Sequence, residues 1–414
     1  MKILQINNFE AVGGGSERVY QLTSSMLMNR GHQVASLSCG VESFDSRKSS
    51  TLLTRNGYVE SNPFKTINNI RNFIYRPESA AAIDGLIEKF RPDIAHLHIF
   101  YGQLSSSVLA ALRRAGVPCV MTVHEYRMLC PISTLYTQRE GVCERCATGE
   151  KRHALQLRCN RGSTFASALS AGESWFRDKY FNYTDYIDHF FMVSRFCLEK
   201  HAEYISTIKE KSSVLYNFIA DKDLPATPLV SRQKTSFLYA GRLSHEKGVD
   251  LLCRAFEQRS HLQLRLAGHG PLAEELKARY KHCANIQFLG GLSSDALKLE
   301  MREAKFCVVP SEWYENNPMS ILESFAAGTA VIGANIGGIP ELVQPNTTGL
   351  LFTPSSGDSL LDALDTAAAM PAEVVCELGR NAQDLIRLKH SESVYYEKLL
   401  AGYEEAMRTQ KRAD

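Results

Sequence analysis

The sequence lacks the long apolar runs of membrane-spanning proteins and the strong basic charge of nucleic-acid-binding proteins. No uninterrupted apolar run approaches the roughly 18 residues that a membrane-spanning helix requires. The formal net charge is only +2, and there is no long run of Lys and Arg, which argues against nucleic acid as a partner. The apolar fraction of 44% and the charged fraction of 22% are those of an ordinary folded protein. We therefore expect a folded, cytoplasmic protein.

A disulfide framework is not expected either. The chain has 11 cysteines, an odd number, and most of them stand alone in apolar segments. Such cysteines are typical of reduced thiols that pack as small hydrophobic side chains. Four others form a pattern that is treated below.

The alternation of apolar strands with amphipathic helices indicates an α/β protein. Strands are expected at 2–7, 93–98 and 118–123, with helices from residue 16 and over 104–115. This alternation predicts parallel, doubly wound sheets. The same rhythm returns later in the chain, with strands expected at 236–240, 262–267, 286–289, 306–309 and 330–334.

The length of 414 residues predicts two domains, because a single hydrophobic core stops growing at roughly 250–300 residues. A polar stretch that contains two prolines indicates a linker between them. The expected division is an N-terminal domain over 1–217 with a cysteine-rich insert at about 130–161, a linker over 218–235, a C-terminal domain over 236–390, and a helix with a tail over 391–414.

The most informative stretch lies at 312–323. Asn317 and Pro318 are a favourable start for a helix that follows a strand. The N-terminus of such a helix offers N–H groups and a positive dipole end, which suit a diphosphate. Glu315 precedes the helix and Glu323 lies within it, so one carboxylate can face a sugar while the other reaches a ribose. Taken alone, such a pair of carboxylates is more commonly an ordinary loop residue and a residue on a solvated helix face.

Two cations lie in another loop that follows a strand. Arg242 offers planar bidentate recognition and Lys247 a point charge, so together they can neutralise a departing pyrophosphate. By themselves they would be ordinary surface residues. A third loop, with Gly268, His269 and Gly270, allows a base or phosphate to approach the backbone.

In content, order and spacing these motifs resemble the family-four (group 1) retaining glycosyltransferases of GT-B fold. The matching elements are G-R-L-x-x-x-K-G at 241–248, the glycine turn, E-x7-E at 315–323 and G-G-I-P-E at 337–341. The resemblance implies two Rossmann-like domains whose parallel sheets face each other across a cleft. It implies that Arg242 and Lys247 hold the donor diphosphate, Glu323 the ribose and Glu315 the sugar hydroxyls. The other donor-binding positions that it implies are His269, Gly270, Asn317, Pro318, Met319 and Ser320.

The N-terminal half resembles the same family through G-G-G-S-E-R at 13–18 and T-V-H-E-Y at 122–126. The resemblance implies that the loop with Gly14 and Gly15 closes over phosphate and acceptor. It also implies that His124 contacts the donor sugar or the transferring centre. Many relatives have Asp where Glu125 stands, which leaves the role of this carboxylate open.

The activity implied by the resemblance is the transfer of a sugar, with retention, from a UDP- or GDP-linked donor to a glycan or polyprenol-linked acceptor in cell-surface polysaccharide biosynthesis. The implied catalytic residues are His124, Glu315, Arg242 and Lys247. Because two cations can neutralise the diphosphate and no D-x-D motif stands in a suitable context, we expect no metal cofactor in catalysis. We expect Glu315 to orient the sugar rather than to form a covalent intermediate.

Two other functions remain possible for such a chain: a sugar-nucleotide epimerase of the same fold, and a non-catalytic donor-binding component of a transferase complex. The ordered motifs at 241–248 and 315–323 argue against the epimerase. The presence of every expected motif residue weakens the case for the non-catalytic component. A dinucleotide dehydrogenase fits less well, because G-G-G at 13–15 is not G-x-G-x-x-G.

Four cysteines in a polar, basic segment stand as C-x12-C-x2-C-x12-C. The spacing allows one tetrahedral structural zinc site, and a long loop with few apolar residues needs some cross-link in a reducing compartment. Four separate reduced thiols fit the pattern almost as well. A subset of the resembled family has a similar insert, which favours zinc. The four residues are Cys130, Cys143, Cys146 and Cys159.

The segment 63–76 has an apolar side edged by cations, which predicts either a core-facing helix or a helix that lies on a membrane. The core-facing helix is the more common case, but a lipid-linked acceptor favours peripheral attachment to the inner face of the membrane. The apolar residues are Phe64, Ile67, Ile70, Phe73 and Ile74, and the cations are Lys65, Arg71 and Arg76.

Overall fold

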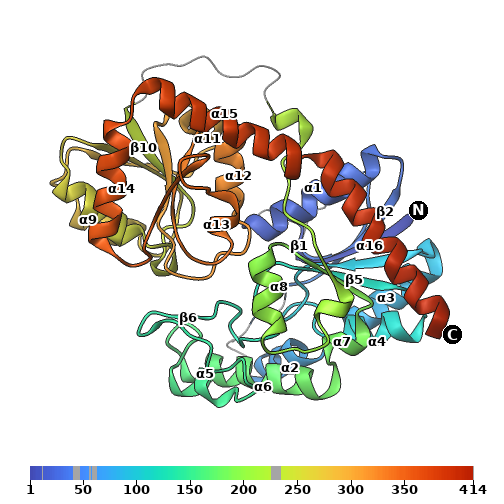
Figure 1. Ribbon diagram of the computed structural model, residues 1–414. Helices are drawn as coiled ribbons and strands as arrows, with labels where there is room; N and C mark the ends of the chain where they lie inside the picture. Colours follow the sequence, from blue (N-terminus) through green and yellow to red (C-terminus); the bar gives the residue numbers. More distant parts are fainter. Residues whose placement is uncertain (12, 41–46, 56, 58–62, 225–234, 414) are drawn as a thin grey trace. The chain divides into compact units, whose positions relative to one another are not determined.

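The computed structural model describes residues 1–11, 13–40, 47–55, 57, 63–224 and 235–413. The chain divides into two compact units, whose elements are labelled in Figure 1. Unit 1 comprises Met1–Leu135, Glu144–Leu215 and Tyr396–Asp414, and unit 2 comprises Tyr136–Cys143 and Tyr216–Tyr395. Residues 225–234, most of the expected linker, lie outside the described residues.

Unit 1 is built on a seven-stranded parallel sheet with the strand order β3-β2-β1-β4-β5-β8-β9. Strands β4 and β5 are buried along their whole length, as expected for parallel strands that helices cover on both faces. The order reverses between β1 and β4, and the carboxyl ends of strands at such a reversal are where open α/β sheets bind ligands. The strands are β1 (Lys2–Phe9), β2 (Gln33–Cys39), β3 (Ser49–Leu53), β4 (Ile94–Leu97), β5 (Cys119–Val123), β8 (His189–Met192) and β9 (Ser212–Val214).

The helices of unit 1 join successive strands. The expected helix from residue 16 is found as α1, and the strands expected at 2–7, 93–98 and 118–123 are found as β1, β4 and β5. The helices are α1 (Gly15–Asn29), α2 (Pro63–Ile74), α3 (Pro77–Phe90), α4 (Ser107–Arg114), α5 (Arg152–Gln156), α6 (Thr164–Tyr180), α7 (Tyr183–Tyr186) and α8 (Arg195–Ala202).

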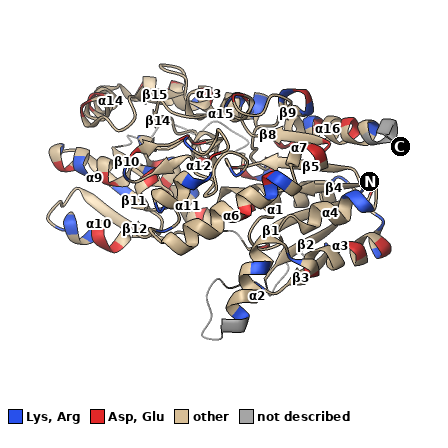
Figure 2. Ribbon diagram, turned by 90° about the horizontal axis from the view of Figure 1, so that it is seen from below, with Lys and Arg blue, Asp and Glu red and all other residues tan. Residues whose placement is uncertain are grey.

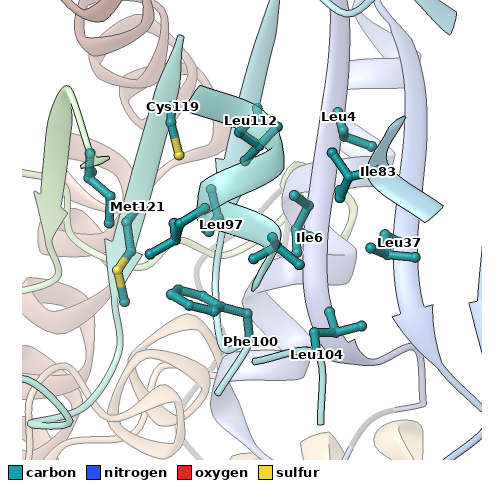
Figure 3. Packing of buried hydrophobic residues seen from close by; sticks show 14 of the residues in the cluster. Leu4, Ile6, Leu37, Ile83, Leu97, Phe100, Leu104, Leu112, Cys119 and Met121 are labelled. Carbon is teal, nitrogen blue, oxygen red and sulfur yellow. The ribbon is translucent and has the colours of Figure 1, made fainter. Parts of the chain in front are cut away.

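The core of unit 1 lies between the sheet and helices α3 and α4 (Figure 3). Leu4 and Ile6 of β1 and Leu97 of β4 are fully buried, as are Ile83 of α3 and Leu112 of α4. Burial of one such side chain contributes about 1.5–3 kcal/mol. This apolar layer therefore fixes the strand ends from which the polar residues of the site follow.

Unit 2 repeats the plan with a six-stranded parallel sheet in the order β12-β11-β10-β13-β14-β15. Its order reverses between β10 and β13, so the general rule for open α/β sheets predicts a ligand site at the carboxyl ends of these two strands. The strands are β10 (Ser236–Ala240), β11 (Gln263–Ala267), β12 (Ile286–Gly290), β13 (Phe306–Val309), β14 (Val331–Ala334) and β15 (Gly349–Phe352). The helices are α9 (Val249–Gln258), α10 (Ala273–Arg279), α11 (Ser294–Glu303), α12 (Met319–Ala326), α13 (Ile339–Leu342), α14 (Gly357–Ala369) and α15 (Ala372–Lys389).

The last helix, α16 (Glu392–Ala413), belongs to unit 1 from Tyr396 onward. The hydroxyl of Tyr403 lies 2.8 Å from Nδ1 of His96 on β4. A Cβ added at Gly402 would lie 2.3 Å from the ring of Phe191, so this glycine permits close packing of the helix on β8. The residue pattern alone could not identify the docking surface of this helix, and the structure identifies it as the N-terminal sheet.

The cysteine-rich insert contains α5 and a short hairpin. The hairpin strands β6 (Tyr136–Thr137) and β7 (Gly141–Val142) pair in antiparallel fashion. They belong to unit 2, where the hydroxyl of Tyr136 donates to the carboxylate of Glu312 at 3.5 Å.

One prediction for the segment 63–76 is wrong. The Arg76 side chain is buried, and its guanidinium donates to the carbonyl oxygens of Thr54 and Gln103 at 3.0 and 3.2 Å. Arg76 therefore stabilises loops inside unit 1 and is not a surface cation. Phe73 is also buried, whereas Ile67 is 64% exposed. The side chain of Phe64 lies outside the described residues.

Candidate active site

The loops after β10 and β13 in unit 2 are held together by backbone contacts. The N–H of Glu312 donates to the carbonyl oxygen of Glu246 at 2.9 Å. Gly248 has a φ of +65°, and a Cβ there would lie 1.9 Å from the carbonyl oxygen of Pro310. Only glycine combines this backbone conformation with so close an approach. These contacts therefore hold the loop with the expected catalytic cations against the loop with the expected carboxylate.

Lys247 and Glu315 meet at the centre of this structure. The Lys247 Nζ lies 2.6 Å from Oε1 of Glu315, and the Ser311 hydroxyl donates to the same oxygen at 2.7 Å. The ammonium group also lies 4.8 Å from the centroid of the Trp313 ring. Burial alone would raise the pKa of Glu315, but the charge of Lys247 and the hydrogen bonds to the carboxylate outweigh it and lower this pKa. Glu315 is therefore an anion at neutral pH.

The start of α12 lies directly after this ion pair. The Asn317 side chain accepts from the N–H of Asn217 at 3.0 Å, and the Asn217 side chain donates to the Asn317 carbonyl at 2.8 Å. Pro318 occupies the N-cap position without a side-chain hydrogen bond to the first turn. Because no side chain caps this turn, the N–H groups near Met319 and Ser320 are suited to an anion.

The glycine turn at 337–338 packs against the backbone of Glu315. The N–H of Gly338 donates to the Glu315 carbonyl at 2.6 Å. Gly337 has a φ of +62°, and a Cβ there would lie 2.3 Å from the same carbonyl oxygen. This close approach explains the glycine at 337.

The remaining residues expected on the donor side surround these loops. The Arg242 side chain is exposed and forms no ion pair within the part of the chain that the structure describes. His269 is exposed beside Gly291, and Gly270 packs on the Leu243 carbonyl. Glu323 is half-buried on the second turn of α12. The structure thus places every expected donor-side residue of unit 2 on loops or helix starts at one edge of its sheet.

In unit 1, His124 follows β5 and joins a stack of three histidines. Its Nε2 lies 2.9 Å from Nδ1 of His98, whose Nε2 lies 2.9 Å from Oε1 of Gln5. The rings of His98 and His96 are also stacked, with centroids 4.4 Å apart. If Gln5 accepts, His98 carries its proton on Nε2, and His124 must donate through its own Nε2.

Burial keeps this stack uncharged. Burial lowers the pKa of His124 to about 3, and burial together with the nearby His124 lowers the pKa of His96 to about 3. Burial lowers the pKa of His98 as well, and the neighbouring His96, His124 and Lys48 act in the same direction. A neutral His124 can hydrogen-bond a hydroxyl group but is a weak proton acceptor at neutral pH. His124 is therefore suited to orienting a hydroxyl group and not to accepting its proton.

The glycine loop of unit 1 precedes α1. Gly14 is the N-cap of this helix, and no side chain caps it. Gly14 and Gly15 are both exposed, so a phosphate or hydroxyl group can reach the backbone there.

The loop 124–135 follows β5, and we call it the histidine loop. A hollow of about 210 Å³ lies beside it, entirely within unit 1. Its charged lining residues are Glu125 and Arg127. Burial raises the pKa of Glu125, against hydrogen bonds from Ser133 and Tyr101 and the charge of Arg127. The complete lining is Phe73, Tyr101, Gly102, Glu125, Arg127, Pro131, Ile132, Ser133, Asn160 and Ser170.

Comparison with known families identifies the chain. The model of Glycosyltransferase Family 4 matches residues 13–222, about half of the chain, and the model of Glycosyl transferases group 1 matches residues 222–384. The chain belongs to glycosyltransferase family 4. Its two units have the GT-B fold, as the motifs predicted.

Curated relatives match this family 4 chain at low identity. An uncharacterized glycosyltransferase of Methanocaldococcus jannaschii is 29% identical over 42% of the chain, and lipopolysaccharide 1,2-N-acetylglucosaminetransferase of Salmonella typhimurium is 31% identical over 43%. The matching segments span about half the length of these relatives, 49% of each. A longer match, at 22% identity over 80% of the chain and 85% of the relative, is a 42.6 kDa protein in the cps region of Klebsiella pneumoniae.

Solved structures agree with the fold over nearly the whole family 4 chain. Sucrose-phosphate synthase from Thermosynechococcus elongatus superposes with a TM-score of 0.72 at 18% identity and covers 99% of both chains. Anabaena Alr3699/HepE, solved in complex with UDP and glucose, superposes with a TM-score of 0.68 at 17% identity, over 97% of this chain and 98% of the other. At these identities the likeness shows the fold alone.

Several site residues escaped the sequence analysis. His96 lies on β4 and His98 directly follows it, and their spacing of two residues was the available signal that both face one side. Tyr101, Asn160 and Ser170 of the hollow carried no motif, because only the folded loops and α6 bring them together.

The four insert cysteines are not grouped closely enough in the described residues to form a metal site. Within the described residues, no three of their sulfur atoms lie within 4.8 Å of one another, and the group that meets this criterion is Glu257, His282 and Cys283 of unit 2. The zinc site therefore stays a prediction. No helix in the described ranges is both long enough and apolar enough to cross a bilayer.

Proposed function

We propose that this family 4 chain transfers a sugar, with retention of anomeric configuration, from a UDP- or GDP-linked donor to a hydroxyl group of a glycan or polyprenol-linked acceptor. The observation that carries the proposal is the contact between Lys247 and Glu315 at the start of α12. One cation, one buried carboxylate and the uncapped first turn of a helix meet there. This combination suits a diphosphate joined to a sugar.

In the proposed reaction the bond between the anomeric carbon and the diphosphate oxygen breaks, and its electron pair stays on that oxygen. Lys247, Arg242 and the N–H groups of α12 stabilise this negative charge. One such donor contributes about 3 kcal/mol, or roughly a hundredfold in rate. The acceptor oxygen forms the new bond on the same face, and its proton passes to the departing phosphate oxygen. Catalysis by these groups requires no metal.

Glu315 and His124 have positioning roles in this proposal. When a diphosphate approaches Lys247, it competes with Glu315 for the ammonium group, which leaves carboxylate oxygens available to sugar hydroxyls. His124 is neutral, so it orients a hydroxyl group without adding charge. A glycosyl adduct on Glu315, found by mass spectrometry of trapped protein, would refute the orienting role.

The hollow beside His124 is the proposed acceptor site. A volume of about 210 Å³ with a carboxylate, an amide and hydroxyl groups along its wall suits a sugar ring. Glu125→Gln should therefore raise KM for the acceptor and leave donor binding unchanged.

The decisive experiment combines donor binding with transfer. A donor present at about 100 times its Kd adds roughly 2.7 kcal/mol of stability, so thermal shifts with UDP and GDP sugars identify the donor. Labelled donor and acceptor extracts then report transfer. Arg242→Ala should lower both signals, whereas the exposed control Lys281→Ala should not. Product without acceptor would indicate an epimerase, and binding without product a non-catalytic component of a complex.

A further inference from the structure

Helix α6 of unit 1 has the reverse of the usual amphipathic arrangement. Surface helices normally bury apolar side chains and expose polar ones. The buried residues of α6 are all polar or charged: Ser167, Ser170, Glu173, Ser174 and Arg177. Its large aromatic residues are exposed instead, with exposed fractions of 51% for Phe165, 56% for Trp175 and 51% for Tyr180.

An ion-pair network holds the polar face of α6 inward. Glu173 is buried between Arg127 of the histidine loop and Arg177, which lies 3.4 Å away on the next turn. Asn160 donates to Ser170 at 2.9 Å. Breaking a buried ion pair by removing one partner costs about 3–5 kcal/mol. These charges therefore fix the rotation of the helix and force the aromatic side outward.

The outward side forms one continuous stripe. Phe165, Ala168, Gly172, Trp175 and Lys179 recur at helical spacing, and none of the five is buried. The Lys179 ammonium lies 5.0 Å from the centroid of the Trp175 ring and 5.2 Å from that of Tyr180. The stripe is therefore apolar along most of its length and ends in aromatic rings with a cation.

The helices α5 and α2, which both pack against α6, add further exposed apolar residues. Leu155 of α5 is 38% exposed and Ile67 of α2 is 64% exposed. Together with Phe165, Trp175 and Tyr180 they form what we call the α6 patch. Exposed apolar groups gathered in this way mark an interaction surface on a folded protein.

Cations dominate the surroundings of the patch. Lys65 and Arg71 of α2 and Lys179 of α6 are exposed, and none of the three forms an ion pair with another described residue. Asp178, the nearby acid on α6, is already paired with Arg177 at 2.8 Å. Figure 2 shows basic residues and no acidic residue on α2.

We propose that the α6 patch binds the surface of an anionic lipid membrane. Trp and Tyr are the side chains that favour the boundary between headgroups and acyl chains, and flanking Lys and Arg residues attract anionic headgroups. A protein partner or a second copy of this chain would equally bury the apolar groups. The cations beside the stripe, which form no ion pair with the described residues, fit a lipid surface of negative charge better.

The patch differs from the surface expected from the sequence. That expectation placed the membrane face on 63–76 alone and included Arg76, which is buried. In the present proposal α6 supplies the aromatic groups, and α2 contributes Ile67, Lys65 and Arg71. The proposal does not depend on the chemistry of the enzyme.

Vesicle sedimentation of the full chain tests the proposal. The probes are vesicles of pure phosphatidylcholine and vesicles with an equal part of phosphatidylglycerol. We expect binding to the anionic vesicles that weakens with salt. Phe165→Asp combined with Trp175→Asp should lower the partition coefficient at least tenfold. The matched control is Leu299→Asp, because Leu299 is 58% exposed on α11 of unit 2 and should leave the partition coefficient unchanged.

Fluorescence gives a second readout, because the chain has only two tryptophans. In a Trp313→Phe variant, Trp175 emission should shift to shorter wavelength on anionic vesicles. Circular dichroism and thermal shift with the donor nucleotide establish that each variant is folded. Absence of vesicle binding by the unaltered chain would overturn the proposal. An equal loss of vesicle binding in the Leu299→Asp variant would also overturn it. So would a dimer of the unaltered chain that dissociates only when the patch residues are replaced.

Discussion

Replacing Lys247 by Met should destabilise unit 2 by roughly 3 kcal/mol at pH 7. The Glu315 side chain is 8% exposed and the Lys247 side chain 25% exposed. Removal of the cation therefore leaves a buried carboxylate without its counter-charge. The loss of one partner from a buried ion pair costs about 3–5 kcal/mol. We take the lower end because Lys247 is partly hydrated. The surface pair of Lys277 and Glu274 is the control, and Lys277→Met should cost less than about 1 kcal/mol.

The effect of Lys247→Met should depend on pH in a defined direction. In the unaltered protein the pKa of Glu315 is lower in the folded state than in the unfolded state. The stability that this group contributes is therefore present above its unfolded pKa of about 4.3 and is lost as the pH falls through the folded pKa. Without Lys247, burial favours the protonated carboxyl and raises the folded pKa, so the variant gains stability as the pH falls. The stability difference should narrow between pH 7 and pH 4.

Urea unfolding followed by Trp313 emission measures this difference locally, because the ring lies 4.8 Å from the Lys247 ammonium. The measurement uses a Trp175→Phe background for every variant. In a double-mutant cycle, Lys247→Met should cost at least about 2 kcal/mol less when Glu315 is already Gln. The ion pair does not contribute the stability assigned to it if Lys247→Met lowers the free energy of unfolding equally with and without the Glu315 carboxylate. The same conclusion follows if the effect of Lys247→Met on stability stays constant down to pH 4.

Three further predictions concern other parts of the molecule. Gly248→Ala should lower the unfolding midpoint and weaken donor binding, because its Cβ would lie 1.9 Å from the Pro310 carbonyl at a φ of +65°; unchanged values for both would contradict the packing described. Glu173→Gln should cost about 3–5 kcal/mol in denaturant unfolding, because it removes the carboxylate paired with the buried Arg127 and one of the two paired with Arg177; a cost below about 1 kcal/mol would contradict that network. Metal analysis should find one zinc per chain held by the four insert cysteines, and zinc-free protein with all four thiols readily alkylated would reject the site.

The sheet and its strand ends could be predicted because both follow from local pattern. Short apolar runs such as 306–309 and 330–334 are typical of strands that are buried on both faces of a parallel sheet. The glycines at 248 and 337 mark places where no side chain fits. The motif residues then lie at strand ends, where the chain leaves the apolar layer and its polar groups become available.

What could not be predicted depends on contacts between distant segments. The burial of Arg76 comes from its contacts with Thr54 and Gln103, which no spacing within 63–76 reveals. Helix α6 shows the same limit more strongly. Its apolar periodicity would place Trp175 in the core, but the ion pairs of Glu173 reverse its orientation. Periodicity identifies a face, and only the partner of that face decides whether it is buried.

The charge states of the two units differ in a way that bears on donor binding. In unit 2, the carboxylate of Glu315 lies 2.6 Å from the ammonium group of Lys247, and in the proposed reaction a diphosphate competes with it for this cation. In unit 1, His124 is kept neutral by burial, with a pKa of about 3. A protonated histidine would offer the diphosphate a second cationic site, in competition with Lys247 and Arg242. In the proposed reaction the neutral histidine stack therefore adds no such competing cation, while His124 remains able to orient a hydroxyl group.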